Sequence, residues 1–416
     1  WGSDTTILRT ESQKDIQLAL ENVFVDLKKK TFQLGDLQLQ TKDIDIPLDN
    51  GFYRLKIGGL DLRKSGLRLD HVHLVSPYSK MEFAYKQPKH QDWFDVKVGN
   101  VRLNDVDIPG YFSTKELRVG GLWINDVLLQ NLKNRKIPVE PHIVPMIYEG
   151  LQKAPVRFKI DTASVANFSV VYEELPVKGD KLGKLGKLYF TDMNGQFSGL
   201  TNIASYPEQF ITLHADGNLM GSGHFTATWQ LPVDSLYDRF LLDARLDSLD
   251  LLSLNEIIKP LAPAEVTSGW AQDVVFHMDA SSRKGRIRLD FPYRKLKVAL
   301  LKEKDGETTQ KGFLSRLANL VLRDNNPAHP ERKDSKLRKV DMEIVRDPYH
   351  STFNYLWQML RPALVESVGV SKKEQDAALK VAGFFTKVKR FFGLDKKKDK
   401  REEIDTNNKE IEPLKE

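Results

Sequence analysis

The chain lacks cysteine altogether, since none occurs among its 416 residues. This absence excludes disulfide bonds, Cys-ligated zinc, iron–sulfur clusters and a cysteine nucleophile. It leaves the cellular compartment open, because a periplasmic protein can dispense with cysteine as readily as a cytosolic one. The sequence also has no apolar run of the ~20 residues that a membrane-spanning helix needs.

The first residues carry no recognisable targeting signal. It begins at Trp1 and has no charged segment followed by an apolar core, as a signal peptide would. We expect residues 1–30 to form an N-terminal edge. This edge would follow a removed signal peptide, a missing membrane anchor or an upstream domain.

Motifs with catalytic spacing are absent too. There is no His-Glu-x-x-His, no Gly-x-Ser-x-Gly and no Gly-rich loop followed by a Walker lysine. His71-x-His73 places two imidazoles on one face of a predicted strand. A catalytic zinc site commonly needs a third protein ligand, and no nearby Asp, Glu or His supplies one.

Other polar motifs have ordinary interpretations. Asp43-x-Asp45 and Asp105-x-Asp107 alternate with Ile and Val, so we interpret these carboxylates as the solvent face of strands. Residues 221–224, Gly-Ser-Gly-His, are interpreted as a hairpin loop. We therefore expect no enzyme activity, catalytic residue, cofactor or metal ion.

The bulk composition permits a buried core and a soluble surface. The sequence is 40% hydrophobic and 29% charged, with a formal net charge of +6. Such a mild positive charge does not by itself indicate a nucleic-acid partner. Because Phe and Tyr mostly fall at the buried positions of predicted strands, we expect no nucleic-acid binding.

Short alternating segments dominate the sequence. Residues 55–62 recur as 117–124, with a looser relative at 96–103, and in each every second residue is apolar. This is the period of a strand with one buried face. We expect the first two segments to be strand pairs broken at Gly58-Gly59 and Gly120-Gly121. There the apolar phase slips by one residue, and a bulge restores the buried face.

Helical patterns are few and short. We expect helices within 143–151, at 252–261, where a proline ends the turn, and at 350–370. The last of these carries a stripe of apolar residues at helical spacing: Phe353, Leu356, Trp357, Leu360, Leu364 and Val368.

Together these patterns predict a mostly β fold. We expect an elongated, twisted and curled sheet of antiparallel type, forming a groove or an open sandwich, with short peripheral helices and a C-terminal amphipathic helix. The expected regions after the N-terminal edge are a first β-repeat region at 31–133, a Pro-rich helical connector at 134–154, a second β region at 155–345, a helix at 346–370, an amphipathic basic helix at 371–394 and a charged disordered tail at 395–416.

The amphipathic segment is the candidate binding element. Apolar side chains recur at helical spacing over 377–392, with lysine and arginine on the other side. This is the pattern of an interfacial membrane helix. The alternatives are a helix that docks its Phe face on the sheet, or one that binds a protein partner. The candidate residues are Phe384, Phe385, Lys387, Val388, Lys389, Arg390, Phe391 and Phe392.

Residues 240–255 resemble the unit of AsmA-like proteins in which a strand is followed by Leu-Asp-Leu and a short helix. The similarity consists of short sequence patterns spread over most of residues 30–370. It continues at 69–75, 94–108, 266–269, 293–298, 317–319 and 346–357.

The resemblance implies a β-rich envelope protein of diderm bacteria. Such proteins are similar to TamB and to eukaryotic bridge-like lipid transfer proteins, which carry phospholipid in an apolar groove. It implies a periplasmic location and an inner-membrane anchor, here an N-terminal helix absent from this chain. This chain is short for spanning a periplasm alone, which weakens the expectation of a bridge more than that of lipid handling.

We therefore expect a non-enzymatic envelope protein that binds or shields lipid acyl chains in an apolar β-groove, for phospholipid transport or outer-membrane homeostasis. Its partners would be phospholipid or a membrane surface, and an envelope protein is a further candidate. The alternative is a structural scaffold of the envelope whose sheets close without lipid. A glycan hydrolase would instead need a convergent pair of acidic residues.

Replacement of Phe384, Phe385, Phe391 and Phe392 by serine tests what the apolar face of the amphipathic segment contacts. Because four neighbouring Phe side chains in water would promote aggregation, we expect the face to be buried somewhere. Docking on the sheet predicts a lower melting temperature for this variant. Membrane contact predicts unchanged melting and lost sedimentation with anionic vesicles. If neither property changes, both interpretations are contradicted.

Overall fold

A computed structural model describes most of the chain up to Gly369. The described residues are 6–9, 16–21, 24–26, 31–33, 35–48, 51–86, 91–137, 142–176, 185–203, 209–233, 238–262, 264–303, 314–320 and 322–369. Residues 1–369 form one compact unit. The amphipathic segment 371–394 and the tail 395–416 lie outside the described residues.

Strands make up most of the described chain. They are β1 (Thr6–Arg9), β2 (Gln17–Glu21), β3 (Phe24–Asp26), β4 (Thr31–Gln33), β5 (Asp36–Leu48), β6 (Tyr53–Arg63), β7 (Gly66–Val75), β8 (Trp93–Val106), β9 (Glu116–Asn134), β10 (Arg157–Leu175), β11 (Gly186–Thr201), β12 (Phe210–Leu219), β13 (Gly223–Pro232), β14 (Arg239–Asp250), β15 (Ala264–Ser281), β16 (Lys284–Asp290), β17 (Tyr293–Glu303), β18 (Leu314–Leu320) and β19 (Lys339–Val345).

The helices are short, apart from the last. They are α1 (Lys80–Lys86), α2 (Ile108–Thr114), α3 (Ile147–Gln152), the 3-10 turn η2 (Leu251–Leu254), α4 (Asn255–Leu261) and α5 (Thr352–Val368). The three predicted helices are confirmed as α3, as η2 with α4, and as α5. The first starts later than predicted, because Met146 is still extended at the helix N-cap.

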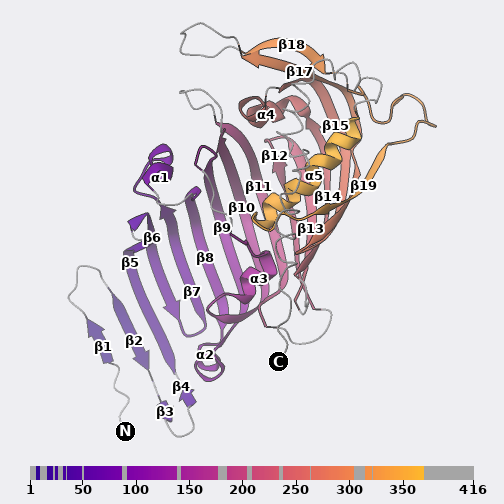
Figure 1. The fold of residues 1–416 in the computed structure, drawn as a ribbon. Helices are drawn as coiled ribbons and strands as arrows, with labels where there is room; N and C mark the ends of the chain where they lie inside the picture. The colour runs from indigo at the N-terminus through magenta and orange to yellow at the C-terminus, as the bar shows by residue number, and fades with distance from the viewer. Residues whose placement is uncertain are drawn as a thin grey trace, which may run out of the picture. The chain divides into compact units, whose positions relative to one another are not determined.

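The strands form one long open sheet (Figure 1). From β5 to β15 each strand pairs with the next one in the chain, and β2 and β1 extend the sheet beyond β5. At β15 the sheet divides, because β16 pairs with one half of β15 and β17 with the other. β19 then adds to β16, and β18 adds to β17. The predicted mostly β class is confirmed. The sheet is open and is not curled as expected.

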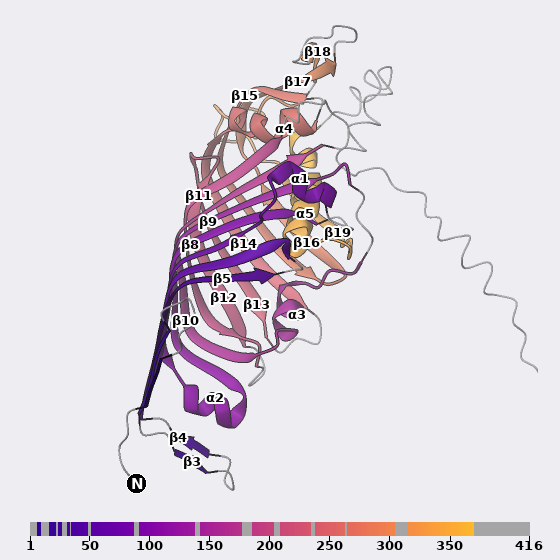
Figure 2. The same cartoon turned by 90° about the vertical axis from the view of Figure 1, so that its left-hand side faces the viewer.

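One pairing departs from the expected antiparallel type. β9 and β10 lie parallel, while the other described strand pairs are antiparallel. Parallel neighbours cannot be joined by a tight turn, because the chain must first return along the sheet. Residues 135–156 make this return and include α3, so the sheet continues across the connector. Figure 2 shows α3 and α5 on the same side of the sheet.

A line of left-handed backbone crosses the sheet, which we call the seam. Asp43, His71 and Asp126 have φ of 51°, 54° and 59°. The pairing register places Gly58 between the first two of them and Gly99 between the last two. Asp, Asn and His tolerate this conformation better than most residues. The seam continues through Asn167 of β10 and Asp192 of β11, which have φ of 53° and 54°.

The expectation that the strands break at the paired glycines is wrong. β6 runs unbroken through Gly58-Gly59, and β9 through Gly120-Gly121. The apolar phase does slip by one residue at the seam, yet pairing of β5 with β6 keeps one register from Lys42↔Gly59 to Ile44↔Ile57. No extra residue is inserted here. The left-handed residue rotates the chain instead, and the glycine opposite leaves room for its side chain.

Valine at Gly99 tests this packing. A Cβ there would lie 2.9 Å from Cβ of Asp126 on the paired strand β9, which is closer than Cβ atoms approach in proteins. We expect the free energy of unfolding in urea to fall by about 1–3 kcal/mol. Gly59→Val is the matched control, because its nearest contact would be an ordinary 3.8 Å. Equal losses in both variants would contradict a steric role for the seam glycines.

Candidate functional site: the apolar face of the sheet

One face of the sheet carries a continuous row of apolar residues. Directly paired residues of neighbouring strands lie on the same face, so the row can be followed from partner to partner. We call it the apolar row. From β2 to β19 it consists of Leu18, Leu39, Leu62, Leu67, Leu103, Leu122, Ala163, Phe197, Leu213, Trp229, Leu242, Met278, Ile287 and Met342.

The next residue along each strand lies on the opposite face, because strand side chains alternate. This neighbouring row is polar except for Trp123. It consists of Gln40, Asp61, Arg68, Arg102, Trp123, Ser164, Gln196, His214, Thr228, Asp243, His277, Arg288 and Asp341. The sheet therefore has one polar and one apolar face over its whole width.

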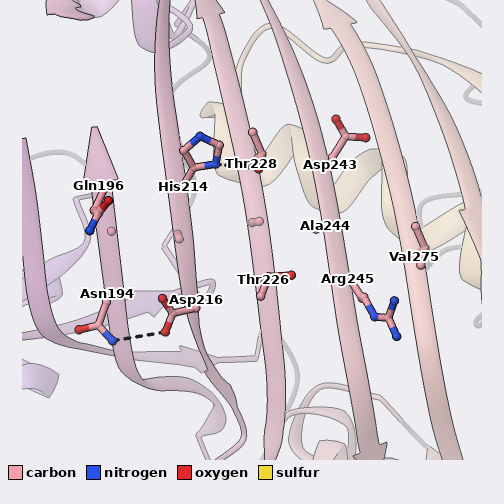
Figure 3. A pocket seen from close by; sticks show the side chains of 13 residues that line it. Asn194, Gln196, His214, Asp216, Thr226, Thr228, Asp243, Ala244, Arg245 and Val275 are labelled. Atoms are coloured by element: carbon pink, nitrogen blue, oxygen red, sulfur yellow. Dashed lines mark hydrogen bonds between the residues drawn. The ribbon is translucent and has the colours of Figure 1, made fainter. Parts of the chain in front are cut away.

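Two of the shallow depressions among the described residues lie on the polar face. Figure 3 shows the first, where the amide of Asn194 donates to Asp216 Oδ2 at 3.3 Å. Nδ1 of His214 lies 3.0 Å from Oγ1 of Thr228 in the same depression, and these side chains project away from α5, which lies behind the sheet. Such pairings between exposed polar groups are typical of a solvated sheet surface.

The second depression contains the motif His71-x-His73 and the pair Asp43-x-Asp45. His73 pairs with Asp95 at 3.1 Å, while His71 and Asp43 are seam residues. Among the described residues, no three His, Asp or Glu side chains are grouped as a metal would need. The alternation signalled strands here, but the left-handed role of His71 has no local sequence signature.

Residues 221–224 follow the hairpin interpretation. β12 ends at Leu219 and β13 begins at Gly223, with a tight turn between them. The backbone N–H of Ser222 donates to the carbonyl of Leu219. This motif is therefore a turn of the sheet, as predicted.

Over its later strands the apolar row is covered. Tyr355, Met359 and Ala363 of α5 have no exposed surface and pack into one cluster with row residues such as Met278 and Ile287. α3 contributes Tyr148 to the same cluster. The ring of Phe353 meets that of Trp229 of β13 edge-on with centroids 5.8 Å apart, and the same cluster reaches back to Phe197 of β11.

Over β5 to β9 the row is open in the described structure. Leu39, Leu62, Leu67, Leu103 and Leu122 are only half-buried and belong to neither buried apolar cluster of the described residues. The small cluster near these strands instead joins Phe83 of α1 to Trp93 and Leu132, which lie outside the row.

A strap of the chain is held against the connection between β19 and α5. It consists of residues 142–146, which belong to the return between the parallel strands. The N–H of Val144 donates to the carbonyl of Pro348 at 2.9 Å, and Arg346 donates to the carbonyl of Val144 at 2.6 Å. Met146 at the end of the strap is buried in the same cluster as Tyr355. The strap is thereby fixed to α5 and its connection to β19.

No family model, curated protein or solved structure matches the chain. Among the helices of the described residues, none combines the length and apolarity needed to cross a bilayer. The candidate residues of the amphipathic segment, from Phe384 to Phe392, lie outside the described residues, so their prediction stands as made.

Valine at Gly285 tests the covering helix. A Cβ at this position of β16 would lie 2.8 Å from both Cε of Met359 and the hydroxyl of Tyr355. We expect α5 to be displaced and the covered apolar face to open, with increased fluorescence of an apolar dye and a lower melting temperature. Arg288→Val, on the polar face of the same strand, should change neither. Unchanged dye binding in the Gly285 variant would contradict this packing.

Proposed function

We propose that the open part of the apolar face binds the acyl chains of lipids and that the protein acts without catalysis. The observation that carries this proposal is the unbroken apolar row, which no described helix covers from β5 to β9. A soluble protein rarely leaves so large an apolar surface in water without a ligand or partner for it.

The physical chemistry of the face suits an acyl chain. Burial of apolar surface stabilises by roughly 25 cal/mol per Å², or about 0.8 kcal/mol for each methylene. This interaction is non-directional, so it needs no polar group in the row. Strands lie ~4.8 Å apart, so the open row from β5 to β9 extends over roughly 19 Å. One leaflet of a bilayer has a hydrocarbon depth of only about 15 Å.

The opposite face of the sheet is polar, which supports a sheet with one lipid-binding face and one hydrated face. Its polar row includes the pair of Asp243 with His277 at 2.6 Å and the hydrogen bond from Gln40 to Asp61 at 3.1 Å. These groups remain hydrated while the apolar face holds its ligand. The sheet thus separates water from hydrocarbon by its own thickness.

A role in phospholipid transport or outer-membrane homeostasis rests on the resemblance to AsmA-like proteins, as do the periplasmic location and the inner-membrane anchor. We propose this cellular setting on that basis alone. The scaffold alternative draws support from the covered part of the row, where α5 already buries the apolar face as a structural protein would. It predicts that the face carries no lipid in the cell.

Site-specific photo-crosslinking distinguishes the two faces. A photoreactive phenylalanine analogue at Leu67 or Leu103 would stand on the open apolar face. The same analogue at Arg68 or Arg102 would stand one residue away on the polar face of the same strands. We expect lipid adducts, detected by mass spectrometry after irradiation in cells, at the two leucine positions only.

Adducts at all four positions would indicate nonspecific membrane contact, and none at any position would favour the scaffold. Leu103→Asp adds a loss-of-function arm, because a carboxylate in the row must be dehydrated when an acyl chain covers it. We expect this variant to retain markedly less co-purified lipid than Arg102→Asp. The melting temperatures of both variants control for folding.

A further inference from the structure

The polar face of the sheet carries an uncharged patch over β10 to β13. Two rows of directly paired residues cross these four strands, and neither row contains Asp, Glu, Lys or Arg. The rows lie on one face, because they are two residues apart along each strand. We call their members the neutral patch: Ser164, Gln196, His214 and Thr228 in the first row, and Thr162, Ser198, Thr212 and Gln230 in the second. Figure 3 shows Gln196, His214 and Thr228 on the side of the sheet away from α5.

The absence of charge sets the neutral patch apart from the rest of the polar face. The whole sequence is 29% charged. Elsewhere this face carries ion pairs, such as Arg68 with Asp70 at 3.0 Å and Arg286 with Asp341 at 2.6 Å. The patch instead presents hydroxyl, amide and imidazole groups, which both donate and accept hydrogen bonds. It suits a ligand that is polar but uncharged, because such a ligand need not dehydrate a charge when it covers the patch.

Few of these groups are used inside the molecule. Nδ1 of His214 lies 3.0 Å from Oγ1 of Thr228, and Oγ1 of Thr162 donates to the carbonyl of Gly120 at 3.2 Å. The side chains of the other members of the patch form no hydrogen bond within the described part of the chain. Their donors and acceptors are therefore available to a ligand.

An exposed tryptophan borders the neutral patch on β9. Trp123 pairs directly with Ser164 and so continues the first row, while Gly121 pairs with Thr162 and continues the second. A Cβ at Gly121 would lie 2.1 Å from Cη2 of Trp123, so the indole ring leans over the glycine and occupies both rows. The side chain is nevertheless 37% exposed. The ring thus forms an aromatic border beside the hydrogen-bonding groups.

We propose that the neutral patch and Trp123 bind an uncharged glycan, a chain of pyranose sugars that lies across the strands. The hydroxyl groups of a sugar match the hydroxyl and amide groups of the patch. The C–H face of a sugar ring is apolar and stacks on the negative face of an indole ring. Strands lie ~4.8 Å apart, a spacing close to the length of one sugar residue in an extended β-1,4-linked chain. Successive sugars would therefore meet successive strands.

The charges around the patch disfavour other polymers. A nucleic acid is held mainly through its phosphates by lysine and arginine, and the neutral patch contains neither. The first row reaches a cation only beyond Trp123, at Arg102, and it ends on the other side at Asp243. An acidic glycan would bring its carboxylates toward that aspartate. The site lies on the face opposite the acyl chains, so it goes beyond the proposed function and does not depend on it.

Titration calorimetry of the whole chain with β-1,4-linked hexasaccharides tests the site. The probes are the neutral cellohexaose and chitohexaose, and hexamannuronate, which has a carboxylate on every sugar. We expect at least one neutral probe to bind about tenfold or more tightly than hexamannuronate. Trp123→Ala, and separately the double variant Q196A/S198A, should each weaken that binding roughly tenfold.

Trp270→Ala is the matched control. This tryptophan is also exposed, but its paired neighbours are Asp250 and Arg294 instead of the patch. The control should bind the sugars as the wild type does. Gly121→Ala keeps the indole ring of Trp123 but displaces it, so this variant should bind more weakly as well. The melting temperature of each variant controls for folding.

Three results would overturn the glycan site. They are no binding of either neutral hexasaccharide, equal affinity for hexamannuronate, and binding that persists in both Trp123→Ala and Q196A/S198A. Binding of an oligothymidylate in place of the sugars would assign the patch to nucleic acid and overturn the proposal too. Each of these results leaves acyl-chain binding on the opposite face untouched.

Discussion

The pairing register of the sheet is the constraint on which the rest of the structure depends. Each apolar residue of the row faces an apolar partner on both neighbouring strands, so a slip of one residue anywhere would turn a strand's leucines toward water. From β5 to β9 the register is kept even at the seam, where the apolar phase changes, whereas the pairing of β10 with β11 shifts register next to Asn167 and Asp192. Left-handed residues such as Asp43 and His71, together with the glycines opposite them, accommodate this one-residue slip of the apolar pattern.

The one parallel pair among the described strands determines how the apolar face is divided. Because β9 and β10 run in the same direction, the chain must return along the sheet, and the return brings Val144 and α3 onto the apolar side. The same return ends against the connection that precedes α5. One topological choice thereby brings α3 onto the face that α5 also covers.

The local part of this architecture could be predicted from the sequence. Alternation identified the strands around Leu55 and Leu117, because the period of two is a property of each strand alone. The continuity of the apolar row could not be predicted, since it depends on which residues pair. The stripe predicted for α5 was only partly right. Leu356 and Leu360 pack on the core, but Phe353 and Trp357 are exposed, and Tyr355 and Met359 are buried in their place.

The order of strands has a consequence for how the sheet is assembled. From β5 to β15 each strand pairs with the one made just before it, and most of these pairs are joined by short connections. Closing a short loop loses little chain entropy, so each new strand can add to a finished edge while the chain is still being synthesised. The exception is the return between β9 and β10, and there growth of the sheet must wait until the strap has crossed. Folding of this protein would then proceed in two stages separated by one slow topological step.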